Sequence, residues 1–182
     1  MALKLRVDDI KPDKPRTVAA EEPVSSFPTL AEMVDRGEVT LAGPVRVDIT
    51  ATAGYDHIRV DGRVSGAAEL VCSRCLADYR GPLESAFTIF YRKAAPGEEE
   101  VEEVELSDVD LLSATYAGDE IDLTPEIEGQ LITEIPIKPL CSESCKGLCS
   151  SCGADLNRTG CGCGNTGRPS AFEALKNFKV KK

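Results

Sequence analysis

The chain has 182 residues, with 31 Asp and Glu, 21 Lys and Arg, and a formal net charge of −10. This length suits one domain, or one domain with a small module attached. The single histidine, His57, excludes a zinc site built on two or three histidines and lies in an alternating segment typical of a strand. No apolar run approaches the roughly 20 residues of a membrane-spanning helix, so we expect no membrane partner.

The first residues, MALKLRVDDIKPDKPR, lack the apolar core of a secretory signal, which predicts a cytoplasmic protein. Cysteines in a reducing compartment are more often metal ligands or redox centres than disulfides. The charge is also uneven: residues 1–137 carry 13 basic and 28 acidic residues, whereas residues 138–182 carry 8 basic and 3 acidic. The basic end either meets an anionic partner or is a solvated tail.

The first half of the chain reads mainly as strands. LKLRV at residues 3–7 alternates and predicts a first strand, and residues 29–36 predict a short helix capped by Thr29. Between residues 39 and 92, β-branched and aromatic residues predict four or five short strands, with a turn at Asp61-Gly62. Consecutive short strands indicate an antiparallel meander or a small barrel.

Residues 95–110 are strongly acidic and predict a solvated linker. A strand at residues 119–123 leads into a helix over 124–135. We expect Thr124 to be its N-cap, with Pro125 at the first helical position. The acidic residues of its first turn, Glu126 and Glu128, favour the positive end of the helix dipole.

We therefore predict an α+β fold: an antiparallel sheet or partial barrel, a few helices and a zinc-stapled C-terminal segment. Residues 1–137 form the mainly β core with the linker and the helix. Residues 138–182 form a cysteine-rich, zinc-binding segment that ends in a helix beginning near Pro169, with lysines at its C-terminal end.

The eight cysteines carry the strongest functional signal. A CxxC turn places two thiolates on one side of a tight loop, as tetrahedral Zn²⁺ requires. Cys72 and Cys75 form one such pair, and the other six cysteines fall within the 23 residues from 141 to 163. The predicted ligands are Cys72, Cys75, Cys141, Cys145, Cys149, Cys152, Cys161 and Cys163.

These ligands divide into two tetrads, which predicts two Zn²⁺ ions per chain. Cys149, Cys152, Cys161 and Cys163 make one local set; the other would join Cys72 and Cys75 to Cys141 and Cys145, which are one helical turn apart. Because Cys145 and Cys149 are also four apart, a different partition stays open. Iron bound by four cysteines is a chemical alternative to zinc, and a redox role for CxxC is another interpretation.

The motifs also resemble a known family. They are VCSRCLADYRGPL, then IPIKPLCSESCKGLCSSCGADLN, the spaced CGC and the closing RPSAFEALKNFK. Together they are similar to the YceD family, the bacterial large ribosomal RNA subunit accumulation proteins, over roughly residues 38–182. Some members of that family lack the last four cysteines. This chain has Gly167-Arg168-Pro169 where Asp-Pro-Arg is usual before the last helix.

The resemblance implies a non-enzymatic factor that assists accumulation or processing of large-subunit (23S) rRNA in ribosome biogenesis. The implied partner is this rRNA or a pre-large-subunit particle, possibly a ribosomal protein, and not DNA. The basic end predicts the RNA-binding residues Arg168, Lys176, Lys179, Lys181 and Lys182. A zinc-ribbon protein-interaction module without RNA contact, and a cysteine redox or electron-transfer protein, are the alternatives.

Overall fold

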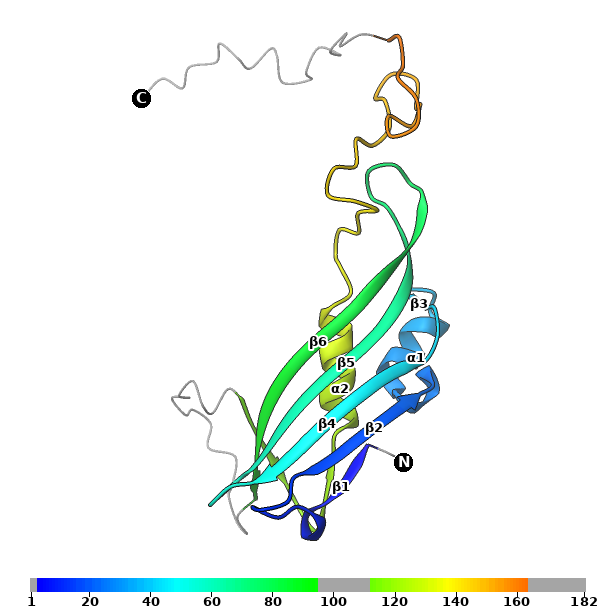
Figure 1. Ribbon diagram of the computed structural model, residues 1–182. Coiled ribbons are helices and arrows are strands. Elements are labelled where there is room, and N and C mark those ends of the chain that lie inside the picture. The colour runs from blue at the N-terminus through cyan, green and yellow to red at the C-terminus, as the bar shows by residue number, and fades with distance from the viewer. Residues whose placement is uncertain (1–2, 95–111, 164–182) are drawn as a thin grey trace, which may run out of the picture.

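The computed structural model describes residues 3–94 and 112–163 (Figure 1). The predicted linker at 95–110 and the predicted C-terminal helix lie outside these residues. The described strands are β1 (Lys4–Arg6), β2 (Arg16–Glu22), β3 (Thr40–Leu41), β4 (Val45–Ala53), β5 (Ile58–Val71), β6 (Asp78–Lys93), β7 (Ser113–Tyr116) and β8 (Glu120–Asp122). The α-helices are α1 (Pro28–Asp35) and α2 (Thr124–Thr133), and 3-10 turns cover Val7–Asp9 and Val24–Ser26.

These elements confirm the predicted α+β class. The main sheet has the order β2-β4-β5-β6-β7, with β3 paired to β5, and a separate ribbon joins β1 to β8. The strand pairs are antiparallel except β6 and β7, which run parallel. Among the described strands β2 and β7 are opposite edges, so the sheet is open rather than closed into a barrel. Both helices lie against one face of it (Figure 1).

The two longest strands, β5 and β6, pair without interruption from Ile58↔Tyr91 to Val71↔Asp78. The predicted turn at Asp61-Gly62 is therefore wrong, because both residues lie inside β5. Gly62 fits there because a Cβ atom would lie 2.2 Å from Cζ of Phe87, so the missing side chain lets the opposite ring lie over the strand. The result is a long ribbon that extends to the cysteine-bearing end.

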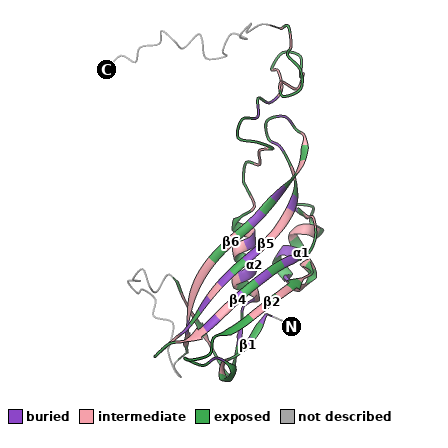
Figure 2. Ribbon diagram, viewed as in Figure 1, coloured by how far each residue is buried: buried purple, intermediate pink, exposed green. Residues whose placement is uncertain are grey.

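The core lies between the sheet and the helices. Alternate residues of β4 and β5 are buried, as the period of a strand with one covered face requires (Figure 2). Val47, Val60 and Val64 on these strands are fully buried in one cluster with Leu30 of α1 and Ile127 of α2. This packing holds the base of the β5–β6 ribbon.

Both predicted helix caps differ from the structure. α1 begins at Pro28, one residue before the expected cap Thr29, because the fixed φ of proline suits the first turn. Thr124 lies inside α2, and Asp122 accepts its backbone N–H through Oδ1 at 3.0 Å. α2 ends at Thr133 and not at 135.

Glu128 also has a role that the sequence analysis missed. Its side chain is only 6% exposed, and Oε1 accepts the backbone N–H of Leu30 at 2.6 Å. The carboxylate thus accepts a backbone N–H from the first turn of α1 and not from its own helix. Its negative charge is favourable there, because the N-terminal end of the α1 dipole is positive. One buried contact joins the two helices across 98 residues of sequence.

Replacing Glu128 tests this contact. Glu128→Leu leaves the Leu30 N–H buried without an acceptor, so we expect a loss of about 2–3 kcal/mol in the free energy of unfolding. Glu128→Gln keeps an acceptor and loses only the charge, so we expect a loss of about 1 kcal/mol or less. Urea denaturation of both variants measures the difference, and equal losses would contradict the capping role.

Candidate metal centre

Two distant segments meet at the end of the β5–β6 ribbon. Cys72 and Cys75 lie in the connection between these strands, at the tip of the hairpin. After α2 the chain runs back along the ribbon and brings Cys141 and Cys145 to the same place (Figure 1). Ser73 accounts for part of this meeting, because its backbone N–H and its hydroxyl both donate to the carbonyl oxygen of Pro139, at 2.9 and 2.7 Å.

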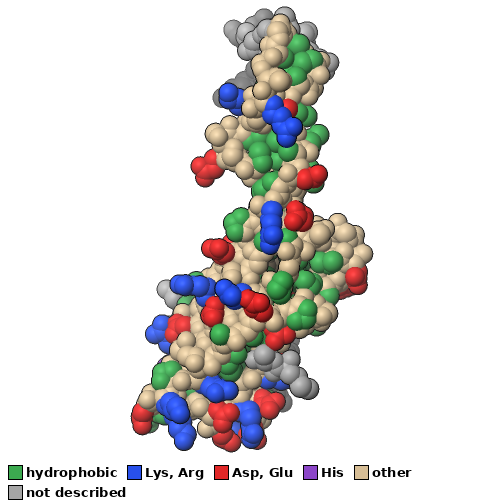
Figure 3. Space-filling model, turned by 45° about the vertical axis from the view of Figure 1, so that its right-hand side comes forward, with side chains coloured by type: hydrophobic (Ala, Val, Ile, Leu, Met, Phe, Trp, Pro, Cys, Tyr) green, Lys and Arg blue, Asp and Glu red, His purple; other side chains and the backbone are tan. Residues whose placement is uncertain are grey.

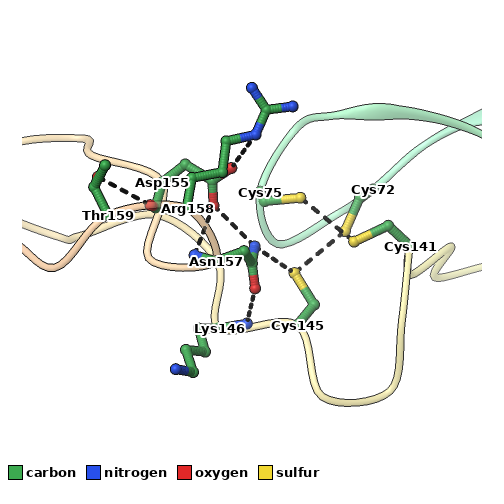
Figure 4. A network of polar contacts seen from close by, with 9 residues as sticks. All are labelled: Cys72, Cys75, Cys141, Cys145, Lys146, Asp155, Asn157, Arg158 and Thr159. Carbon is green, nitrogen blue, oxygen red and sulfur yellow. Dashed lines mark hydrogen bonds and ion pairs between the residues drawn. The ribbon is translucent and has the colours of Figure 1, made fainter.

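The sulfurs of this first group, Cys72, Cys75, Cys141 and Cys145, all lie within 4.8 Å of one another (Figure 4). Cys72 Sγ is 3.8 Å from Cys145 Sγ, and Cys75 Sγ is 3.6 Å from Cys141 Sγ. Zn²⁺ bound to four thiolates at about 2.3 Å gives a tetrahedron whose edges are about 3.8 Å long. The observed separations match that edge, so this group can hold a metal ion.

Arg74 fixes the second segment against the first. Its Nη1 atom donates to the carbonyl oxygen of Cys145 at 2.9 Å and to that of Glu143 at 3.2 Å. The spacing of Cys141 and Cys145 suggested a helical turn, but the two residues do not lie on one. A turn in which the Cys145 N–H donates to Ser142 O at 3.1 Å brings them together instead. The Arg74 bonds hold this turn beside the CxxC loop.

The first group is also a small core of its own. Cys72 is fully buried, and Cys145 is 4% exposed. Tyr79, Leu140 and Leu148 pack against these cysteines. The ribbon tip and the C-terminal segment therefore share apolar contacts as well as sulfur atoms, which is typical of a closed structural site.

The second group is local. Cys149, Cys152, Cys161 and Cys163 also have sulfurs within 4.8 Å of one another. The first pair lies on a tight turn, where the Gly153 N–H donates to Cys149 O at 2.9 Å and the Cys149 N–H to Ala154 O at 2.8 Å. The Ser151 N–H lies 3.4 Å from Cys149 Sγ. The structure thus assembles the same two sets of four that the spacing favoured.

The two CxxC turns share a backbone feature. The residue after the second cysteine has a left-handed backbone conformation in each turn, with a φ of 58° at Leu76 and of 74° at Gly153. Glycine adopts this conformation without strain, whereas leucine costs about 1–2 kcal/mol. Leu76 is also 65% exposed. The turn after Cys75 is therefore held by its surroundings and not by a local preference.

In each group, backbone N–H donors lower the pKa of one cysteine, and neighbouring thiols raise the pKa of another. The N–H groups of Cys141 and Cys75 lower the pKa of Cys72 to about 6, while the Cys145 and Cys75 thiols raise that of Cys141 to about 12. In the second group, the N–H groups of Cys152 and Ser151 lower the pKa of Cys149 to about 6. The Cys152 side chain raises the pKa of Cys163 to about 12. Against the effect of burial, the pKa of Cys145 is lowered as well, chiefly by its hydrogen bond from Asn157. Each set thus holds thiols with lowered and with raised pKa values, and a bound cation would be needed to keep all four as thiolates.

The surface at this end carries both signs of charge. The space-filling view narrows between the sheet and the cysteine-bearing end, where Lys and Arg side chains lie among acidic and apolar ones (Figure 3). Residues 138–163 have three basic and two acidic residues. The predicted RNA-binding residues Arg168, Lys176, Lys179, Lys181 and Lys182 lie outside the described residues.

Two polar residues at the centre escaped the sequence analysis. Arg74 lies between the ligands of the first CxxC, and Asn157 follows the second CxxC by five residues. Asn157 Nδ2 lies 3.3 Å from Cys145 Sγ of the first group. Only the position of Arg74 between two predicted ligands could have drawn attention to it, because its contacts are with distant backbone.

Comparison with known proteins gives the family to which this chain belongs. Residues 60–179 match the family described as Large ribosomal RNA subunit accumulation protein YceD. The match covers most of the β5–β6 ribbon and all eight cysteines. The chain belongs to the YceD family.

Similar proteins occur in plants and mycobacteria. The chain is 27% identical over 164 residues to the chloroplastic Large ribosomal RNA subunit accumulation protein YCED homolog 1 of Arabidopsis thaliana, covering 75% of this chain and 49% of that protein. The Zea mays homolog 1 is 28% identical over 159 residues, covering 75% and 53%. An uncharacterized Mycobacterium tuberculosis protein is 30% identical over 111 residues, covering 60% and 50%.

The chain thus spans about half the length of these relatives. No solved structure matches it. Over residues 3–94 and 112–163, neither α-helix has the length and apolar character needed to cross a membrane.

Matched cysteine variants test the two groups. Cys72→Ser removes a buried sulfur that joins the ribbon to the C-terminal segment, so we expect a loss of about 2 kcal/mol or more in the free energy of unfolding. That loss would lower the melting temperature by about 4–8 °C for a chain of this size. Cys161→Ser leaves the four sulfurs of the first group in place, so it should lower the melting temperature less. Calorimetry compares them, and equal small effects would overturn this division of roles.

Proposed function

We propose that this protein is a non-enzymatic factor that supports accumulation or processing of large-subunit (23S) rRNA during ribosome biogenesis. The observation that carries the proposal is membership of the YceD family, through a match that includes both cysteine groups. The plant relatives bear the same description in their names. Two sets of four sulfur ligands suit structural metal sites, which agrees with a factor that acts by binding rather than by catalysis.

We further propose that each cysteine group holds one structural Zn²⁺. Four sulfur ligands fill a tetrahedral shell and leave no position for water or substrate, as in structural and not catalytic zinc sites. None of the eight cysteines forms a disulfide, which agrees with a role as metal ligands in a reducing compartment. Iron bound by four cysteines has the same geometry, and metal analysis separates the two.

The redox alternative has less support. A reactive CxxC typically has a low-pKa thiol at the N-terminus of a helix that follows a strand. Here the chain continues from Cys75 through a short loop into strand β6. Cys72, whose pKa is lowered, is fully buried and so is poorly accessible to a substrate disulfide.

The proposed partner is large-subunit rRNA or a pre-large-subunit particle. The described part of the cysteine-rich segment is nearly neutral, whereas residues 164–182 hold five basic residues and one acidic. Phosphate contacts are therefore assigned to Arg168 and the terminal lysines. The near-neutral surface at 138–163 favours a second candidate function, docking on a ribosomal protein without RNA contact.

Replacing Lys176, Lys179, Lys181 and Lys182 with Gln tests the RNA contact. Each phosphate contact contributes about 0.7–0.9 to the slope of log affinity against log salt, so losing all four should flatten the slope by about three units. Titration of large-subunit rRNA at several salt concentrations measures this. In cells, we expect large-subunit RNA to fall while small-subunit RNA stays level.

A matched control removes the same number of positive charges from another part of the chain. Lys4, Lys11, Lys14 and Lys93 are exposed residues of the part of the chain before the cysteine-rich segment, and their replacement with Gln should leave the slope unchanged. Particles isolated with each variant are then analysed for RNA and for ribosomal proteins. If the terminal variant still co-purifies with pre-large-subunit particles as the parent does, the lysines are not the contact, and a protein partner is indicated.

A further inference from the structure

We propose that Asn157 couples the two cysteine groups, so that the loop closed by the second group controls how tightly the first group holds its metal. This inference rests on the metal binding proposed above. It adds a positioning residue and an interdependence between two sites that otherwise look separate.

Asn157 connects them directly. Its Nδ2 atom donates to Cys145 Sγ at 3.3 Å, and its Oδ1 atom accepts the backbone N–H of Lys146, the residue next to that ligand, at 2.8 Å (Figure 4). One side-chain amide thus contacts a ligand sulfur of the first group and the backbone beside it. Polar donors of this kind orient metal ligands and stabilise the negative charge on them.

The amide is itself held in place by Asp155. Asp155 Oδ1 accepts both the backbone N–H and the side-chain Nδ2 of Asn157, each at 2.9 Å. The carbonyl oxygen of Asp155 accepts the backbone N–H of Thr159 at 3.0 Å and its hydroxyl at 3.3 Å. The turn that carries Asn157 therefore has a defined shape.

This turn belongs to the loop of the second group. Residues 153–160 lie between Cys152 and Cys161, both of which are in that group. The same segment runs antiparallel to 146–149, with a bridge between Leu148 and Asp155 and a bond from the Leu156 N–H to Gly147 O at 2.9 Å. A metal that joins both ends of the loop reduces the conformations available to Asn157.

The coupling follows from these contacts. With the second site filled, the loop presents the Asn157 amide to Cys145; with it empty, the loop opens and the sulfur loses that donor. Loss of such a partner typically weakens metal binding by about 10- to 100-fold. Because coupling between binding sites is reciprocal, metal in the first site should also tighten the second.

The test uses the full-length protein loaded with zinc and an excess of a chromophoric zinc chelator. Asn157→Asp keeps an oxygen for the Lys146 N–H but replaces the donor to sulfur with a second oxygen. We expect release from the first site to quicken about 10-fold or more and, because the coupling is reciprocal, release from the second site to quicken as well. Thr159→Val, which alters the same turn without touching sulfur, is the control. Cys161→Ser assigns the two phases by removing the second.

The double variant Asn157→Asp/Cys161→Ser completes the experiment. If Asn157 carries the coupling, first-site release in the double variant is no faster than in the faster single variant. Additive effects, or a first-site rate within twofold of the parent in Asn157→Asp, overturn the proposal. Equal acceleration of both phases by Thr159→Val, which leaves the donor to the sulfur in place, also overturns it, because the shape of the loop and not Asn157 then sets both rates. A parent chain that holds no metal instead contradicts the metal binding on which the inference rests.

Discussion

The arrangement of the C-terminal segment depends on one contact: four sulfur atoms from the tip of the β5–β6 ribbon and from the turn at 141–145. Cys75 and Cys141 are 66 residues apart in sequence, yet their sulfurs lie 3.6 Å from each other. Neighbouring thiols raise the pKa of Cys141, so the set cannot ionise fully without a cation to offset the repulsion. The second cysteine loop contacts this junction through Asn157.

Local patterns predicted the elements of the fold but not their lengths or ends. Alternation identified β1 and β-branched residues identified β4, while Pro125 lies in the first turn of α2, one residue after its start. Gly62 looked like part of a turn because glycine next to Asp usually is one. Its actual partner, the Phe87 ring across the ribbon, is a tertiary contact invisible to a local pattern. Glu128 was assigned to its own helix for the same reason, although its acceptor role serves α1.

The candidate centre was more accessible to sequence reasoning, because ligand spacing is itself a geometric constraint. Two CxxC turns and a CxC restrict how eight thiols can meet, and the grouping favoured by spacing is the grouping that the structure brings together. The residues that hold the ligands were not accessible. Arg74 acts on backbone carbonyl oxygens more than 60 residues away, and Asn157 reaches a sulfur of the other group. The spacing of the cysteines predicts neither contact.

The central claim is that metal, and not packing alone, joins the ribbon to the C-terminal segment. Anomalous diffraction at the zinc absorption edge, on crystals of protein purified without added metal, tests it most directly. The account predicts two peaks per chain, one of them about 2.3 Å from the sulfurs of Cys72, Cys75, Cys141 and Cys145. Clear density for these four side chains without a peak between them, or with disulfides joining them, would contradict it.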